Sequence, residues 1–211
     1  PMPDGRLYAE HLVETFFGGD LFHWLDEYLE LLLGVHLRLW LVYGIALEAN
    51  QQNSVLVYEA GQPLRLLMKD NDSGRLLHSR CSAAAPELAG LLAQIRDRRL
   101  LAEGDLALAQ MFSTIILQLN IAAVIEALGE RHPQLRESCY ARLRQKLRGL
   151  LLDLSEEGVD TGPAEDSLLH SDRLYVKYLL SAGSLFDKRE LGASDINKYY
   201  GLSCPNFLGE R

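Results

Sequence analysis

The sequence is poor in cysteine and has no excess of basic residues. Its three cysteines, Cys81, Cys139 and Cys204, lie far apart and form no C-x-x-C pair. That pattern excludes a disulfide-stabilised scaffold and a cysteine-rich zinc or iron–sulfur site. Lys and Arg number 21 against 29 Asp and Glu, which gives a net charge of −8 over 211 residues. Because a nucleic-acid binder normally carries a basic surface, nucleic acid is not an expected partner.

The sequence also lacks an apolar run that is long and free of charge. Its longest apolar stretch, residues 31–47, contains Gly34, His36 and Arg38. Since basic side chains are costly inside a bilayer, this stretch predicts a buried helix and no membrane partner. The chain opens with residues 1–4, PMPD, without a basic and then apolar leader. We therefore expect a cytoplasmic protein, and we expect this sequence to be a piece of a longer one.

Two common kinds of catalytic centre have no motif in the sequence. The six histidines show neither the H-x-x-x-H nor the H-E-x-x-H spacing of zinc sites. The Gly-x-Ser-x-Gly elbow of many serine hydrolases is absent as well. Function therefore has to be sought in other residue patterns.

Apolar residues recur at helical spacing along most of the chain. The segment from Asp105 to Leu128, closed by Gly129, is apolar almost all round, which is typical of a helix in the middle of a bundle. Residues 155–167 are acidic and contain Gly and Pro, so we expect a surface loop there. The other predicted helices cover Asp20 to about Ala49 with Gly34 as a candidate break, Pro86 to Leu101, Pro133 to Leu154 with Arg142, Arg144, Lys146 and Arg148 on a solvated face, and Arg173 to Ser181.

The segment from Ser54 to Asp70 has a different character. A β-branched and aromatic run at residues 55–58 and a second extended run at 64–68 flank a turn cluster at 59–63. This pattern predicts a β-hairpin. Together with the helices it predicts a mainly α domain with a small β element (α+β), a helical bundle that carries the hairpin.

The predicted hairpin brings oxygen ligands together at its open end. Strands folded about Gly61 pair residues whose numbers sum to about 122 or 123, which places Asn53 beside Lys69 and Asp70. An amide oxygen and a carboxylate at that separation can share one divalent cation, and Mg²⁺ prefers such hard oxygen ligands. Asn53 and Asp70 are therefore the predicted metal ligands of the hairpin.

Further polar residues precede and follow this pair. Residues 48–53, EANQQN, hold one carboxylate and four carboxamides, and Glu48 would share a face with Gln51 if the helix continued that far. Lys69 and Arg75 add cations suited to phosphate. This inventory is that of a metal–nucleotide site. The alternative is that the amides cap a helix end and the charges are only solvated.

Residues 44–57, GIALEANQQNSVLV, and residues 65–70, RLLMKD, resemble the C-terminal part of NRPS-independent (aerobactin-synthetase-like) siderophore synthetases. The family pattern is Gly-Ile-x-x-Glu-Ala-His-x-Gln-Asn, a hairpin and Arg/Lys-Asp. Residues 174–180, around Lys177, resemble a second and weaker family stretch. The resemblance implies that residues 1–211 form the single palm-like C-terminal domain of a homodimeric synthetase. The N-terminal ATP-binding part would be its partner, and the fragment alone is expected to be inactive.

The resemblance implies an ATP-dependent ligase for siderophore biosynthesis and iron acquisition, with ATP and Mg²⁺ as cofactors. A carboxylate, of citrate or a succinyl-type group, attacks the α-phosphate to give an acyl-adenylate and pyrophosphate. An amine, hydroxylamine or alcohol then displaces AMP. The family histidine falls on Asn50, which can offer only a neutral amide N–H. The surrounding spacing favours the alcaligin-type subgroup that acts on succinyl-hydroxamate precursors.

Site roles follow from the resemblance together with the residue types. Lys177 lies in an apolar stretch, so its ammonium must reach a carboxylate or a substrate group, or else extend to solvent. The resulting assignments are Glu48, Asn50 and Lys69 as catalytic residues, Gln51, Asn53, Arg75 and Lys177 as nucleotide-binding residues, and Glu48, Asn53 and Asp70 as metal ligands.

Two other functions stay open. A kinase-like phosphotransferase could use Asn53 and Asp70 for metal, although no His-x-Asp-type base precedes the amide. A ferric-siderophore reductase or an iron-transport-associated module is the other alternative, because reductases of iron uptake share distant similarity with this region. The lack of a cysteine cluster for an iron–sulfur centre weighs against a reductase.

Overall fold

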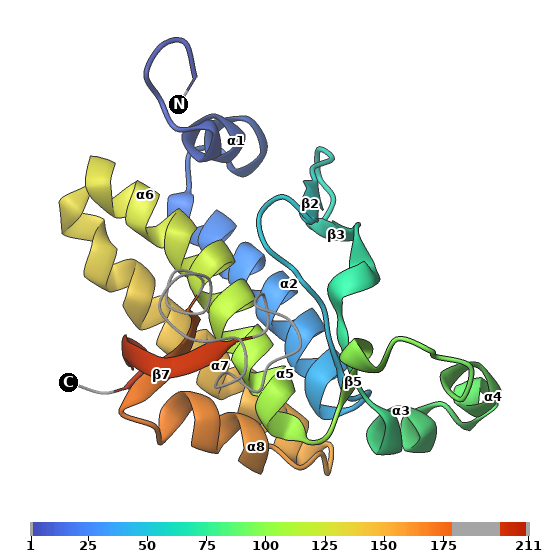
Figure 1. Cartoon of the computed structure of the whole chain (residues 1–211). Coiled ribbons are helices and arrows are strands. Elements are labelled where there is room, and N and C mark those ends of the chain that lie inside the picture. The colour runs from blue at the N-terminus through green and yellow to red at the C-terminus, as the bar shows by residue number, and fades with distance from the viewer. Residues whose placement is uncertain (1, 179–198, 210–211) are drawn as a thin grey trace.

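A computed structural model describes residues 2–178 and 199–209 of the chain. Long helices form a bundle at its centre (Figure 1). They are α2 (Leu21–Leu41), a continuous run of α5 (Asp105–Met111), the π-helical η4 (Phe112–Ala122) and α6 (Ala123–Arg131), and α7 (Arg136–Glu156). The predicted mainly α architecture with a small β component is confirmed.

Short elements surround the bundle. Within the described residues there are three small sheets: β1 and β5 flank β4, β2 pairs with β3, and β6 pairs with β7. The strands are β1 (Ile45–Ala46), β2 (Ser54–Val57), β3 (Arg65–Met68), β4 (Arg75–Leu77), β5 (Leu101–Ala102), β6 (Arg173–Lys177) and β7 (Tyr200–Pro205). The short helices are α1 (Tyr8–Phe17), η1 (Asn71–Ser73), α3 (His78–Ala84), η2 (Pro86–Leu88), α4 (Ala89–Leu92), η3 (Arg98–Leu100), η5 (Pro133–Leu135), α8 (Gly162–Ala164) and η6 (Glu165–Leu169).

Helix α2 begins where the sequence predicts and ends earlier. The carboxylate of Asp20 caps it by accepting the backbone N–H of His23 at 2.9 Å. The helix runs unbroken through Gly34 and stops at Leu41, so the predicted continuation to Ala49 is wrong. The physical reason is Gly44, whose φ of +69° turns the chain out of the helix into β1.

The segment from α5 to α6 is the central helix of the bundle, as its all-round apolar pattern predicts. Phe112, Ile116 and Ile121 are fully buried, and Gly129 lies inside α6 and does not end it. Residues Asp105–Arg131 are apolar and long enough to cross a membrane, but 72% of the most apolar window is buried inside the protein. That burial is the pattern of a core helix.

Three further predicted segments differ from the structure. The helix predicted over Arg173–Ser181 is wrong, because residues 173–177 form strand β6 against β7, and residues 179–181 lie outside the described part. The helix predicted from Pro86 to Leu101 is reduced to short turns of helix followed by β5. The loop predicted at 155–167 is only partly a loop, since α7 extends to Glu156 and α8 and η6 follow.

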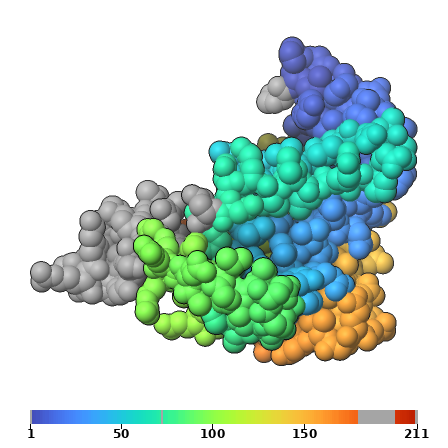
Figure 2. All heavy atoms as spheres, turned by 90° about the vertical axis from the view of Figure 1, so that its right-hand side faces the viewer, coloured from blue at the N-terminus to red at the C-terminus, as the bar shows by residue number. Residues whose placement is uncertain are grey.

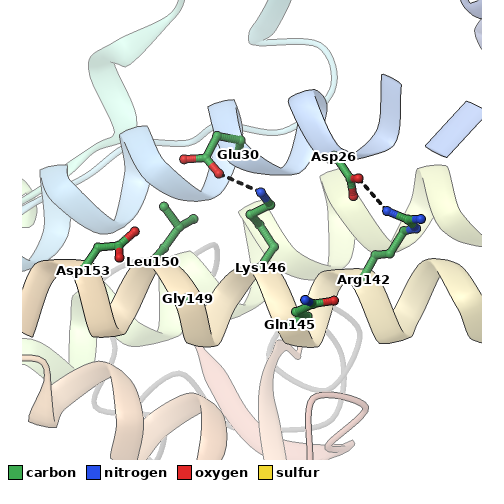
Figure 3. A pocket seen from close by; sticks show the side chains of 8 residues that line it. All are labelled: Asp26, Glu30, Arg142, Gln145, Lys146, Gly149, Leu150 and Asp153. Atoms are coloured by element: carbon green, nitrogen blue, oxygen red, sulfur yellow. Dashed lines mark hydrogen bonds and ion pairs between the residues drawn. The ribbon is translucent and has the colours of Figure 1, made fainter. Parts of the chain in front are cut away.

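The basic side of α7 is not simply solvated. Arg142 pairs with Asp26 and Lys146 pairs with Glu30 of α2, with 2.9 Å between Lys146 Nζ and Glu30 Oε2 (Figure 3). These pairs border a polar cavity of about 310 Å³ between the two helices. Its lining contains none of the predicted site residues. Arg142 and Lys146 on α7 therefore face acidic side chains on the neighbouring helix α2. The sequence pattern of α7 alone cannot show that α2 lies beside it.

Candidate functional site

The hairpin has the predicted register. Ser54 lies opposite Met68 and Val57 opposite Arg65, so each pair of residue numbers sums to 122. Just beyond the strands, the N–H of Lys69 donates to the carbonyl oxygen of Asn53 at 3.1 Å. The expected neighbourhood of Asn53 and Lys69 at the open end of the hairpin is confirmed.

The six residues before the hairpin form a turn that Asn50 holds in shape. Its side-chain Oδ1 accepts the backbone N–H groups of Gln52 and Asn53, both at 3.0 Å, and its carbonyl oxygen accepts the N–H of Ser54 at 2.9 Å. Such side-chain to backbone bonds compete with helix formation. No helix continues through this segment, so the condition under which Glu48 and Gln51 would share a helix face is not met.

Asn53 and Asp70 lie on adjacent backbone but in different surroundings. The Asn53 side chain is buried, with its Nδ2 donating to the carbonyl oxygen of Glu48 at 2.9 Å. Its Oδ1 accepts no hydrogen bond from the described residues. Asp70 adopts a φ of +54°, and its exposed carboxylate lies 3.6 Å from Lys69 Nζ. A metal ion shared by the two side chains stays a prediction.

Lys177 reaches a carboxylate. Its Nζ lies 3.2 Å from Glu48 Oε1, and the two side chains are only 15% and 26% exposed. This answers the question of whether its ammonium is paired or extends to solvent. The two residues are 129 positions apart, so the fold brings the two stretches of family resemblance together.

The π-helical segment η4 anchors both sides of this ion pair. Gln118 Nε2 and Thr114 Oγ1 donate to the carbonyl oxygen of Tyr175 at 2.6 and 3.0 Å, two residues before Lys177. Asn120 Nδ2 donates to the carbonyl oxygen of Ala49 at 2.9 Å, next to Glu48. Sequence reasoning missed these residues, although polar side chains inside an otherwise apolar helix were a visible signal. Segments of π-helix are frequent at functional sites.

A buried tyrosine fixes Asn120 in turn. The Tyr28 hydroxyl donates to Asn120 Oδ1 at 2.8 Å, and burial raises the pKa of Tyr28, which keeps it a donor. Gln51 Nε2 approaches the carbonyl oxygen of Asn120 at 3.4 Å. The loop that carries Glu48 and Asn50 is thus tied to the bundle core through the side chain and the carbonyl oxygen of Asn120.

The remaining predicted residues occupy two environments. Lys69 is exposed beside Asp70 and can offer its ammonium to an anion. Arg75 is buried in β4, and its Nη1 donates to the carbonyl oxygen of Arg99 at 2.7 Å. That nitrogen of Arg75 therefore holds the β4–β5 region together, and its assignment to nucleotide binding stays a prediction.

No group of three or more His, Cys, Asp or Glu side chains that could hold a metal ion occurs within residues 2–178 and 199–209. Magnesium bound by one or two carboxylates, an amide oxygen and nucleotide phosphates would form no such group. The exposed Asp70 carboxylate and the Asn53 Oδ1, which accepts no hydrogen bond from the described residues, are oxygen ligands of the kind that such a hard cation prefers.

Comparison with known proteins covers most of the chain. A family model described as "Ferric iron reductase FhuF-like transporter" matches residues 23–193. A curated relative, the spermidine-citrate ligase of Bacillus anthracis, is 35% identical over 68 residues, which are 32% of this chain and 11% of the ligase.

Two solved structures share the fold. The petrobactin biosynthesis protein AsbB from Bacillus anthracis matches 98% of this chain with a TM-score of 0.72 and 16% identity. The ATP-bound aerobactin synthetase IucA from Klebsiella pneumoniae matches 96% with a TM-score of 0.68 and 18% identity. This chain spans 33% of each of them. The likeness to NRPS-independent siderophore synthetases inferred from residues 44–70 is therefore confirmed at the level of the fold.

Proposed function

This chain belongs to the ferric iron reductase FhuF-like transporter family, and within that family we propose that it is the C-terminal domain of an ATP-dependent siderophore synthetase. The observation that carries the proposal is the Glu48–Lys177 ion pair at the base of the hairpin. Two separate sequence stretches resemble the synthetases, and Glu48 of one stretch forms an ion pair with Lys177 of the other in the fold. The similarity to the spermidine-citrate ligase and to the two solved structures also supports a synthetase.

We propose that the hairpin base binds Mg²⁺–ATP. Asp70, the Oδ1 of Asn53 and Glu48 would supply oxygen ligands, with Lys177 keeping the Glu48 carboxylate in place. When bound, the ion would neutralise phosphate charge. Lys69 is exposed on the same edge and would contact a phosphate oxygen.

The proposed reaction has two steps. A carboxylate oxygen of the acid attacks the α-phosphorus of ATP, the bond to the bridging oxygen breaks, and pyrophosphate leaves. The nitrogen of an amine or hydroxylamine then attacks the acyl carbon, AMP departs with the carboxylate oxygen, and the nitrogen loses its proton. Fixed positive charge and amide dipoles near the phosphates stabilise the developing negative charge.

Asn50 bears on the subgroup of synthetase. Its Oδ1 is committed to the turn, while its Nδ2 donates to no described residue and so remains for a phosphate or substrate oxygen. This supports the proposal that the Asn50 Nδ2 group makes the phosphate or substrate contact of the histidine found at this position in the family. We propose that the protein belongs to the alcaligin-type subgroup, whose members act on succinyl-hydroxamate precursors. The full protein would act in the cytoplasm as a homodimer, with its N-terminal part completing the site.

A second function is favoured by one observation, the description of the matching family as a ferric iron reductase. A reductase would need a redox centre. The three cysteines lie on α3, α7 and β7, and Cys81 and Cys139 are buried. Burial raises the pKa of each of these two thiols, which disfavours the thiolate that ligates iron. The ligase therefore remains the better-supported proposal.

Product analysis of the full-length protein separates the two functions. With citrate as acid, hydroxylamine as nucleophile and Mg²⁺–ATP, a ligase forms AMP, pyrophosphate and a hydroxamate in equal amounts. A panel of succinyl-type acids extends the test, since the acid is set by the subgroup. Reduction of a ferric hydroxamate without ATP consumption would support the reductase and overturn the ligase.

A further inference from the structure

An uncharged cavity lies beside the candidate site. It has a volume of about 460 Å³, is open to solvent on one side, and lies between α1, α2, β2 and the end of the central helix. Figure 2 shows the turquoise hairpin between α1, in dark blue, and the lighter blue α2. The lining is formed by Tyr8, Ala9, Leu12, Trp24, Tyr28, Leu32, Gln51, Ser54, Val55, Leu56, Tyr58, Asn120 and Val124. None of these side chains is charged, and the volume is that of a small-molecule pocket.

Two aromatic side chains of the cavity, Trp24 and Tyr28, donate their polar hydrogens to other residues of its lining. Trp24 and Tyr28 stack with 5.3 Å between ring centroids and 10° between ring planes. Trp24 Nε1 donates to the Tyr58 hydroxyl at 2.9 Å, and the Tyr28 hydroxyl donates to Asn120. What the wall offers a ligand is therefore mainly apolar surface. An ionised group would lose its hydration there without gaining a partner of opposite charge.

The cavity is joined to the candidate site by shared residues. Gln51 and Ser54 line it and lie on either side of the Gln52–Asn53 turn. Asn120 forms part of its wall and also holds the carbonyl oxygen of Ala49, next to Glu48. A ligand in the cavity would thus lie behind the loop that carries the predicted nucleotide ligands.

We propose that this cavity binds an uncharged, ring-sized apolar group of the nucleophile that the synthetase acylates. The assignment to a substrate rests on the proposed function. The acid is a poor occupant, because a carboxylate-rich molecule requires cations and the lining has none. The non-reacting aryl or alkyl portion of an amine or hydroxylamine fits the apolar walls and leaves its nitrogen outside them.

The direct test uses 4-fluorobenzyl alcohol as a neutral ring-sized probe and ¹⁹F relaxation as the readout, with the full-length protein. Val124→Phe fills the cavity from α6, and Val35→Phe is the matched control, because Val35 lies on α2 outside the lining. We expect the wild type and Val35→Phe to bind the probe equally, and Val124→Phe to bind it about tenfold more weakly or not at all. Leu12→Phe provides a second filling variant if Val124→Phe fails to fold.

Three results would overturn the proposal. Equal binding of the probe by the filled variants and the wild type would place the probe elsewhere. Preference for tetraethylammonium over the neutral probe would identify a cation-binding aromatic box instead. Loss of probe binding as protein concentration rises would show that a second copy covers the cavity. Probe binding requires no ATP. The cavity proposal can therefore fail while pyrophosphate formation persists, and the proposed ligase function can fail while the probe still binds.

Discussion

The Glu48–Lys177 ion pair is the contact on which the site depends most. Both side chains are largely buried, so removal of one leaves a poorly solvated charge behind. We expect Lys177→Met to lower the free energy of unfolding by about 1–2 kcal/mol, and the double variant with Glu48→Gln to lose less than the sum of the two single changes. Denaturant unfolding of the four proteins of this cycle measures the coupling.

The control is an exposed ion pair on the same hairpin. Arg65 and Glu59 lie 3.0 Å apart with side chains 63% and 60% exposed, so Arg65→Met should change stability by only a few tenths of a kcal/mol, about the value for surface pairs. Strictly additive effects of the Glu48 and Lys177 substitutions would show that this pair is as weak as a surface one.

His36 makes stability depend on pH. It is buried in α2, and its ring nitrogens have no hydrogen-bond partner among the described residues. Burial lowers its pKa to about 4 from 6.5, so the folded protein holds it neutral. The unfolded chain takes up a proton below about pH 6.5, and stability present above that pH is lost as the pH falls toward 4. The loss should approach about 3 kcal/mol.

His36→Leu should remove this dependence and stabilise the protein near neutral pH, because it replaces two unsatisfied buried nitrogens with apolar atoms. Thermal unfolding between pH 4.5 and 7.5 measures both effects. The carboxyl groups with lowered pKa, such as Asp105 beside Arg80, act below this window and should affect both proteins alike. A wild-type melting temperature that stays flat through the window would contradict the assignment.

For single residues, the sequence predicts that a charged side chain needs a partner, but it does not predict which residue that partner is. The apolar surroundings of Lys177 require a carboxylate or solvent, but Glu48 is 129 residues away and only the fold selects it. Asn50 is the converse case. Its residue type suggests that it contacts substrate, whereas its side-chain oxygen accepts hydrogen bonds within the local turn. The sequence alone cannot show which of these two roles the side chain has.

Among the elements, the hairpin is the best predicted, because its pattern is local. Its turn residues at 59–63 and the extended run on each side of them fix the register without distant partners. Strand β6 is the opposite case, since residues 173–177, RLYVK, contain an apolar run of only three residues, which fits helix or strand equally well. Its state is decided by pairing with β7, more than twenty residues later. The π-helical geometry of η4 also depends on tertiary contacts, such as those to Tyr175 and Ala49.

The turn from α2 into β1 predicts a difference between two glycines. Gly44 and Gly61 have nearly equal φ values of +69° and +70°. A Cβ at Gly44 would lie 2.8 Å from Arg80 Cβ and 3.0 Å from the carbonyl oxygen of Leu77, whereas a Cβ at Gly61 meets nothing within 4 Å. Gly61→Ala should cost only the left-handed backbone strain, about 1 kcal/mol. Gly44→Ala should cost about 3 kcal/mol because overpacking is added.

Chemical denaturation of the two alanine variants tests this comparison. Equal destabilisation would show that the backbone at Gly44 relaxes away from Arg80. A large loss at Gly44 alone would confirm that the entry into β1, and with it the placement of Glu48 two residues beyond that strand, is fixed by close backbone packing.

For the molecule as a whole, the chain spans a third of the two synthetase-related structures that share its fold. If the remaining part supplies phosphate contacts, the 211-residue chain should release no pyrophosphate from Mg²⁺–ATP with citrate and hydroxylamine, while the full-length protein does. A coupled pyrophosphate assay of both proteins at equal concentration measures this. Robust turnover by the shorter chain would refute the division of the site between two parts.

The central claim is that the base of the hairpin holds Mg²⁺–ATP, and pyrophosphate release by full-length Asp70→Asn tests it most directly. Glu59→Gln is the control, an exposed acid at the turn of the same hairpin. We predict that Asp70→Asn lowers acid-dependent release about 100-fold or more, with unchanged unfolding, and that Glu59→Gln has no effect. Equal rates for Asp70→Asn and the wild type would contradict the account.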